Sequence, residues 1–140
     1  MGLINSLAIT DSALTVNRLQ MDVIANNTAN ADTTVTPQGG PYKREDVVLA
    51  PANIEGSIPG GLQNAGVQIA AIVQDQTPPR QVYDPTNPQA NKQGYVSYPN
   101  VDPVTEMTDM MAAQRAYQAN ITMADNEKSM AMRAIDLGHA

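Results

Sequence analysis

Proline and glycine are distributed unevenly along this chain of 140 residues, and their distribution limits the possible fold more than any other feature. Nine of the 10 Pro and seven of the 9 Gly lie within residues 33–100. A continuous helix cannot pass through that region, because Pro lacks a backbone N–H and Gly weakens helical order. Long helices are therefore possible only at the two ends of the chain.

The N-terminal segment, residues 3–27, is predicted to be a helix with a wide apolar surface. A first row of positions, spaced by three and four, is Leu3, Leu7, Thr10, Leu14, Asn17, Met21 and Ile24. A second row is Ile9, Ala13, Val16, Gln20 and Val23. Two rows make a broader surface than a helix needs for one partner. Both an ordinary core helix and a helix that touches several neighbours fit this pattern.

The C-terminal segment, residues 103–136, is predicted to be a second and longer helix. Asp102 suits the N-cap, Pro103 the first helical position and Gly138 the end. Glu106 lies near the positive end of the helix dipole. Its apolar row is Met107, Met110, Gln114, Tyr117, Ile121, Ala124, Lys128, Ala131 and Ile135. At about 1.5 Å per residue this helix measures roughly 50 Å, so much of the row must meet the first helix or another chain.

The contact between the two helices is expected to be an imperfect, antiparallel, coiled-coil-like pairing. Thr10, Asn17, Gln114 and Lys128 interrupt the apolar rows, and polar interruptions select register and partner. Six of the 8 Met lie in the second helix. Met packs adaptably, so these side chains indicate either gap filling within one chain or contacts between chains, and we favour the second.

The middle of the chain is predicted to hold short antiparallel strands joined by long loops. The candidate strands are Tyr42–Leu49, Val67–Val73, Gln81–Tyr83 and Tyr95–Tyr98. The stretch YDPTNP is typical of a turn, with Asp84 and Asn87 bonding nearby backbone. The predicted fold class is α+β, with a long helix at each end of a small antiparallel β insert. Residues 1–32 and 101–140 would form one discontinuous helical domain, and residues 33–100 the insert.

The first helix ends in an unusual run of short amides, VIANNTANADT at residues 23–33. A helix end leaves about four carbonyls without intrahelical partners, and Asn side chains can donate to them and tolerate left-handed geometry. The same amides could instead bridge to another chain. Either role makes Asn26, Asn27 and Asn30 structural residues.

Composition excludes several classes of function. A net charge of −6 argues against nucleic acid and against an anionic membrane surface as partners. There is no Cys, no apolar run long enough to span a bilayer, and no pattern of a secretory signal at the N-terminus. The one His, His139, is expected to be a frayed terminal residue, and Glu45–Asp46 a solvated edge. Lys43 and Arg44 belong to a charged strand start and could discourage edge pairing. We therefore expect no catalytic, cofactor or metal site.

Both ends of the chain resemble signatures of the bacterial flagellar rod and hook proteins. At the N-terminus the resemblance is carried by SALTVNRLQMDVIANNTANADT, and at the C-terminus by YPNVDPVTEMTDMMAAQRAYQANITMADNEKSMAMRAIDLG. The stretches GGPYKREDVVLAP and TPPRQVYDPTNPQANKQGYVSYPNVDPV, with the short length, are similar to a member from the proximal rod. Thr28 stands where the family often has another residue.

The resemblance implies a structural subunit of the flagellar basal-body rod, in the periplasm, that polymerises through its terminal helices into a torque-transmitting shaft. Implied partners are other copies, neighbouring rod proteins, the basal-body base and the flagellar type III export apparatus, which would deliver the chain without a cleaved signal peptide. Alternatives are another axial component of the flagellum or of a type III secretion system, and a cytoplasmic coiled-coil adaptor. We further expect the isolated monomer to have weakly protected ends.

The residues expected to carry helix packing and assembly come from both terminal segments. They are Leu7, Leu14, Arg18, Leu19, Met21, Ile24, Asn26, Asn27, Asn30, Asp102, Glu106, Met107, Met110, Arg115, Tyr117, Asn120, Ile121 and Ile135.

Overall fold

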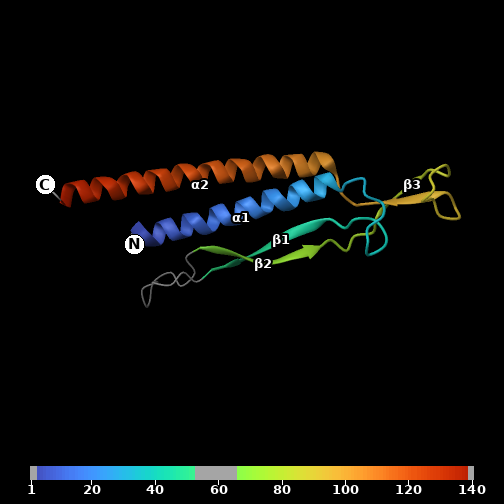
Figure 1. Ribbon diagram of the computed structural model, residues 1–140, viewed down its shortest axis with the longest axis horizontal. Coiled ribbons are helices and arrows are strands. Elements are labelled where there is room, and N and C mark those ends of the chain that lie inside the picture. The colour runs from blue at the N-terminus through green and yellow to red at the C-terminus, as the bar shows by residue number, and fades with distance from the viewer. Residues whose placement is uncertain (1–2, 53–65, 139–140) are drawn as a thin grey trace.

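The computed structural model describes residues 3–52 and 66–138, and His139 lies outside the described residues. The helices are α1 (Leu3–Ala29) and α2 (Pro103–Gly138), and the strands are β1 (Glu45–Pro51), β2 (Val67–Gln74), β3 (Arg80–Tyr83) and β4 (Tyr95–Tyr98). The predicted α+β class, with a helix at each end of a small antiparallel β region, is confirmed (Figure 1).

The two helices lie side by side and antiparallel. Thr10 of α1 contacts Glu127 of α2, and Asn27 near the other end of α1 contacts Glu106 in the first turns of α2. Helix α2 has 36 residues and α1 has 27, so the C-terminal end of α2 extends beyond the start of α1 (Figure 1). Beyond the start of α1, that end of α2 is not paired with another of the described helices.

Strands β1 and β2 form an antiparallel hairpin against α1, which therefore lies between α2 and the hairpin (Figure 1). Glu45 is opposite Gln74 and Pro51 is opposite Val67, with an irregularity between Val48 and Leu49. The backbone N–H of Val67 donates to the Ser12 hydroxyl at 3.2 Å, which fixes the start of β2 on α1.

Strands β3 and β4 form a second antiparallel hairpin, which projects past the ends of the helices (Figure 1). In its turn Asp84 accepts from the Thr86 N–H, as the sequence predicted, and the Thr86 hydroxyl and N–H hold the pKa of Asp84 below its usual value. Gly94 has a φ of 82°, and a Cβ there would lie 2.9 Å from the Tyr83 ring, so this turn requires glycine.

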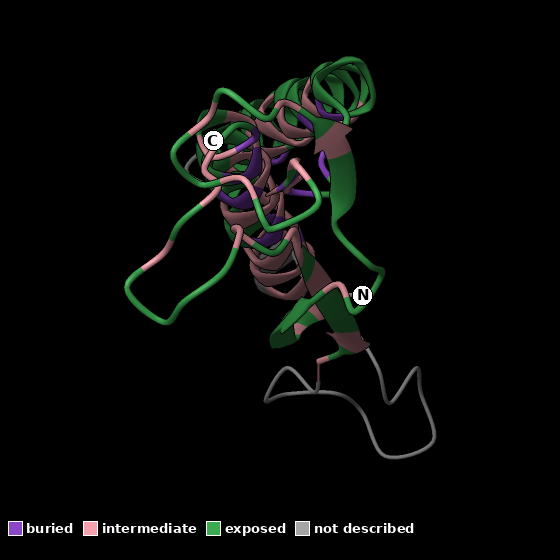
Figure 2. Cartoon of the chain, turned by 90° about the vertical axis from the view of Figure 1, so that its right-hand side faces the viewer, coloured by how far each residue is buried: buried purple, intermediate pink, exposed green. Residues whose placement is uncertain are grey.

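The apolar interior is small for a chain of this length. Its buried hydrophobic side chains are Val16, Val23, Ala31, Val96, Val101 and Ala113. Figure 2 colours all buried positions, polar ones included, purple, and they form only a few patches within a largely exposed cartoon. Because the core is narrow, most of the apolar surface of α2 remains outside it, including Met107, Met111 and Met123.

The face of α2 that meets α1 differs from the predicted row by one residue at several positions. The fully buried residues of α2 are Glu106, Ala113 and Glu127, whereas Met107, Gln114, Lys128 and Ile135 are exposed. The expected row followed side chains by polarity, but two glutamates occupy buried positions because each finds a hydrogen-bond donor on α1. The polar interruptions expected at Gln114 and Lys128 were therefore wrong, and the one at Thr10 is confirmed.

Strand β1 begins at Glu45, three residues later than predicted. The backbone N–H of Tyr42 donates to the Thr33 carbonyl rather than to β2, so the chain before Glu45 pairs with the loop after α1. The asparagines at the end of α1 do not use the left-handed geometry that Asn tolerates, because the described residues with positive φ are all glycines.

Candidate functional site

The start of α2 is fixed by Asp102, as predicted. Its carboxylate accepts from the Val104 N–H at 3.0 Å and from the Thr105 hydroxyl at 2.9 Å. One backbone donor that the helix leaves unpaired, the Val104 N–H, is thereby satisfied, and the negative charge lies at the positive end of the helix dipole. The cap sets where the first turn of α2 begins, and so where Glu106 meets α1.

Glu106 is the centre of a charged cluster where α2, α1 and the start of β1 meet. Its side chain is 0% exposed, and its Oε1 accepts from the Arg44 Nε at 2.6 Å. Arg44 also contacts Asp46 at 2.6 Å and Asp109 at 3.7 Å. Burial works against the charge of Arg44, but the hydrogen bond and charge of Glu106 prevail and raise the pKa of Arg44.

Arg44 was expected to discourage edge pairing at a charged strand start, but it pairs with a buried residue instead. It precedes β1 and reaches across to α2, because a buried carboxylate is stable only with a cation and hydrogen-bond donors close by. Lys43, its neighbour, is exposed as expected. The sequence shows the pair Lys43–Arg44 but gives no signal that the two side chains have different environments.

Asn27 joins the same three elements and is 1% exposed. Its amide nitrogen donates to the Glu45 carbonyl at 2.9 Å and to Glu106 Oε2 at 3.2 Å. Its amide oxygen accepts from the Glu45 N–H and from the Tyr42 hydroxyl, each at 2.9 Å. The side chain therefore pairs with both backbone groups of Glu45, as a neighbouring strand would, and attaches β1 to α1.

The other two asparagines act locally at the end of α1. Asn30 donates to the Asn26 carbonyl at 2.9 Å, so the predicted capping by an amide is confirmed at this residue. Asn26 is exposed and donates to the Tyr42 oxygen at 3.3 Å. Burial, and then the charges of Glu45 and Glu106, raise the pKa of Tyr42 to about 12, which keeps its hydroxyl protonated as a donor to Asn27.

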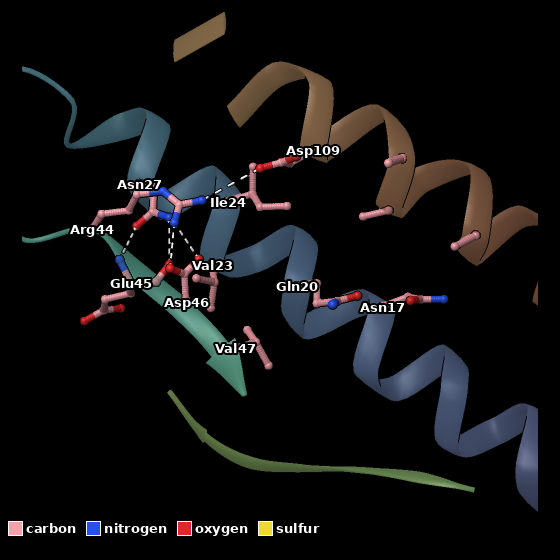
Figure 3. A pocket seen from close by; sticks show the side chains of 13 residues that line it. Asn17, Gln20, Val23, Ile24, Asn27, Arg44, Glu45, Asp46, Val47 and Asp109 are labelled. Atoms are coloured by element: carbon pink, nitrogen blue, oxygen red, sulfur yellow. Dashed lines mark hydrogen bonds and ion pairs between the residues drawn. The ribbon is translucent and has the colours of Figure 1, made fainter. Parts of the chain in front are cut away.

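A groove of about 400 Å³ begins beside this cluster (Figure 3). Its lining residues from α1 include Asn17, Gln20, Val23 and Ile24, those from β1 include Asp46 and Val47, and those from α2 are Asp109, Ala112, Ala113 and Ala116. Small side chains on α2 leave this space open. The groove holds polar amides and acids but no arrangement of a nucleophile with a base, so its geometry favours contact with another surface over catalysis.

The opposite end of the helix pair has a second buried carboxylate, Glu127, which is 8% exposed. The Thr10 hydroxyl donates to it at 3.3 Å, and no ion pair joins it to a described Lys or Arg. Met123 and Met130, on either side of Glu127 in the helix, are more than half exposed. Within the described residues, the buried carboxylate at this end of the helix pair therefore has fewer polar partners than Glu106 has.

The structure places the expected assembly residues in four groups. Asn27 and Glu106 are buried together, and Asn30 and Asp102 cap the helix ends. Residues partly covered in the helix pair or by the hairpin are Leu7, Leu14, Leu19, Met21, Ile24, Met110, Tyr117, Asn120 and Ile121. Exposed residues are Arg18, Asn26, Met107, Arg115 and Ile135. Sequence reasoning missed Arg44, Tyr42 and Glu127.

The described residues include no group of three or more His, Cys, Asp or Glu side chains that could hold a metal ion. Within the same part of the chain, neither helix is apolar enough over a sufficient length to cross a membrane.

Known proteins match both ends of the chain and then its full length. Residues 7–35 match the family described as Flagella basal body rod protein, and residues 92–137 match the family described as Flagellar basal body rod FlgEFG protein C-terminal. The flagellar basal-body rod protein FlgC of Borreliella burgdorferi is 43% identical, over 96% of this chain and 97% of that protein. FlgC of Bacillus subtilis is 41% identical, over 96% and 97%, and FlgC of Salmonella typhimurium is 41% identical, over 99% of each.

Similarity of this extent, continuous through the helices and the β region, cannot come from the terminal helices alone. The chain belongs to the FlgC family of flagellar basal-body rod proteins.

Proposed function

We propose that this protein is a structural subunit of the rod in the flagellar basal body and that it polymerises there through α1 and α2 into a shaft that transmits torque. Membership of the FlgC family, at 41–43% identity over nearly the whole chain, is the observation that carries the proposal. The location in the basal body follows from the same membership.

The geometry supports polymerisation because the chain leaves much apolar helix surface without cover. On α2, Val104 is 72% exposed, and Met107 and Ile135 are each 60% exposed. Water-exposed apolar surface of this extent on a single helix is typical of an interface with another protein. Head-to-tail contacts with a rotation that does not close generate a helical tube, which is the geometry of a shaft.

Partners follow from the same proposal. They are other copies of this chain, neighbouring rod proteins, the basal-body base and the flagellar type III export apparatus. The division into a helical domain of residues 1–32 and 101–140 and an insert of residues 33–100 stays a prediction, as do the weakly protected ends of the monomer. The described residues fit a protein without enzymatic activity, in line with relatives that are rod proteins.

A deletion of the gene in the bacterium that carries it tests the proposal. We expect cells that lack a hook and do not swim, with both restored by the intact gene in trans. Immunogold labelling or mass spectrometry of purified basal bodies should find the chain in the rod fraction. Normal swimming by the deletion strain would contradict the rod function, and a chain confined to the cytoplasm would favour a coiled-coil adaptor.

A further inference from the structure

Two strips on α2, in which the apolar side chains are exposed, carry charges of opposite sign, and the acidic residue of the second strip is itself nearly buried. The first, here the basic strip, consists of Val104, Met107, Met111 and Arg115, at spacings of three and four residues near the start of the helix. The second, the acidic strip, consists of Met123, Glu127, Met130 and Leu137 near its end. Residues at these spacings lie on one face of a helix, so each strip is a continuous row.

Glu127 is the unusual member of the acidic strip because it is nearly buried without a cation. Glu106 shows what a buried carboxylate requires in this fold: Arg44 at 2.6 Å and the Asn27 amide at 3.2 Å. Among the described residues, Glu127 accepts a side-chain hydrogen bond from the Thr10 hydroxyl alone, at 3.3 Å. A carboxylate removed from water is stabilised strongly by an added cation, so Glu127 is prepared for a positive side chain from outside the chain.

The basic strip offers such a side chain in a matching apolar setting. Arg115 is exposed and makes no ion pair with a described residue, and Met111, four residues before it, is 49% exposed. Met123 precedes Glu127 by the same four residues. The methylene groups of an arginine cover methionine side chains well while its guanidinium reaches a carboxylate. The two strips are therefore complementary in charge and alike in apolar character.

We propose that the acidic strip of one copy binds the basic strip of a second copy, with Arg115 of the second copy paired to Glu127. This inference rests on the proposed function and adds which surfaces meet. The strips lie at opposite ends of α2. At 3.6 residues per turn, they are also rotated about the helix axis by about a third of a turn relative to each other. A contact between unlike strips leaves one strip free at each end, so copies can add without limit.

Disulfide cross-linking tests this contact directly, because the chain contains no Cys. Basal bodies are purified from cells whose only copy carries both Met111→Cys and Met130→Cys, and are then treated with a mild oxidant. We expect disulfide-linked dimers and higher multimers on non-reducing gels. Each single-Cys variant should give at least about tenfold fewer disulfide-linked multimers. Because unlike strips meet, the one Cys of such a variant lies beside a residue of the neighbouring copy that is not Cys.

The matched control pairs Met111→Cys with Asp125→Cys. Asp125 is exposed in the same part of α2 but is two residues from both Met123 and Glu127, so it faces a different side of the helix. If this control cross-links as well as the test pair, or if the test pair gives no multimers although the chain is present in the basal bodies, the inference is overturned and the proposed function stands. Absence of the parent chain from basal bodies would instead overturn the proposed function.

A second measurement separates a role in assembly from a role in the fold. Glu127→Gln should leave the melting temperature of the dilute monomer unchanged or higher, and should reduce multimers of the double-Cys protein at least about tenfold. Glu106→Gln serves as the comparison and should lower the melting temperature, because Arg44 loses its buried charge partner. Equal losses of melting temperature in both variants would show that Glu127 serves the fold, and would overturn the pairing with Arg115.

Discussion

Two glutamates of α2 are buried against α1, and their surroundings differ. At Glu106 three elements converge, and the carboxylate has Arg44, the Asn27 amide and the covering β1 segment around it. At Glu127 the Thr10 hydroxyl is the one donor within the described part of the chain, and exposed methionines lie beside it. The same residue type therefore serves two purposes in one helix pair. One end is complete within the chain, and the other is open to a neighbour.

The difference shows where this chain stabilises its own fold. A narrow apolar core cannot fix two long helices in register, since Leu, Ile, Val and Ala contacts tolerate small shifts. A buried carboxylate with a fixed set of donors tolerates none, because a shift leaves it unpaired. The cluster at Glu106 thus sets the register of α1, α2 and β1 together.

The largest effect should come from removing the cation of that cluster. Arg44→Met keeps the length of the side chain but leaves Glu106 buried without a charge partner, which should cost about 3 kcal/mol of unfolding free energy. Urea unfolding followed by circular dichroism measures this. Lys43→Met is the control, since Lys43 is exposed, and should change the value by about 0.5 kcal/mol or less. Similar losses in both would refute the assigned role of Arg44.

A smaller loss is expected when the amide that links the three elements is removed. Asn27→Ala leaves both backbone groups of Glu45 and one oxygen of Glu106 without their partner, at a cost of about 2 kcal/mol. Asn26→Ala is the matched control, because Asn26 is exposed in the adjacent position. If the two variants unfold at the same urea concentration, Asn27 does not hold β1 on α1.

The end of the helix pair at Glu127 should lose less stability on substitution than the end at Glu106. Thr10→Val keeps the shape of the side chain and removes the hydroxyl that donates to Glu127, which should cost about 1 kcal/mol. Thr10→Ser keeps the donor and should retain more of the stability. A loss from Thr10→Val as large as that from Arg44→Met would remove the contrast between the two ends.

At neutral pH, Tyr42→Phe should change the unfolding free energy least of these variants. The slope of that free energy with pH should differ from that of the parent in alkali. The pKa of Tyr42 rises from 10.0 to about 12, by burial and then by the charges of Glu45 and Glu106. The unfolded chain releases this proton at lower pH than the folded chain does. The associated stability is therefore present below about pH 10 and is lost as the pH rises toward 12.

Unfolding free energies of the parent and Tyr42→Phe proteins, measured from neutral to strongly alkaline pH, check this expectation. Above pH 10 the unfolding free energy of the variant should fall less steeply with pH than that of the parent. The absorbance difference between the two folded proteins should show the Tyr42 phenolate appearing only toward pH 12. Parallel curves would mean that Tyr42 does not contribute to the alkaline dependence.

Much of the fold could be predicted because Pro, Gly and side-chain periodicity act locally. The positions of Pro and Gly confined the helices to the ends, and the alternation in Val67–Val73 indicated a strand that the structure extends by one residue. The Asp102 cap and the turn at Asp84 were also predicted, since both depend on neighbours two residues away. Local signals of this kind need no knowledge of the tertiary structure.

The charged cluster could not be predicted because its members meet only in the folded chain. Asn27 contacts Glu45 across 18 residues and Glu106 across 79. Sequence reasoning assigned Glu106 to the helix dipole and Arg44 to a charged strand start, since a charged side chain is exposed far more often than buried. The shift in the buried row of α2 has the same cause, because two of its positions are glutamates.

The antiparallel pairing of the two ends of the chain also has a consequence for the rate of folding. Thr10 and Glu127 are 117 residues apart in the chain, so α1, made first, must wait for almost the entire polypeptide before its partner exists. Closing a loop of that length is slow compared with forming a local hairpin. Until then α1 and α2 cannot pair. The long connection between them therefore delays the step at which the nascent polypeptide becomes rigid.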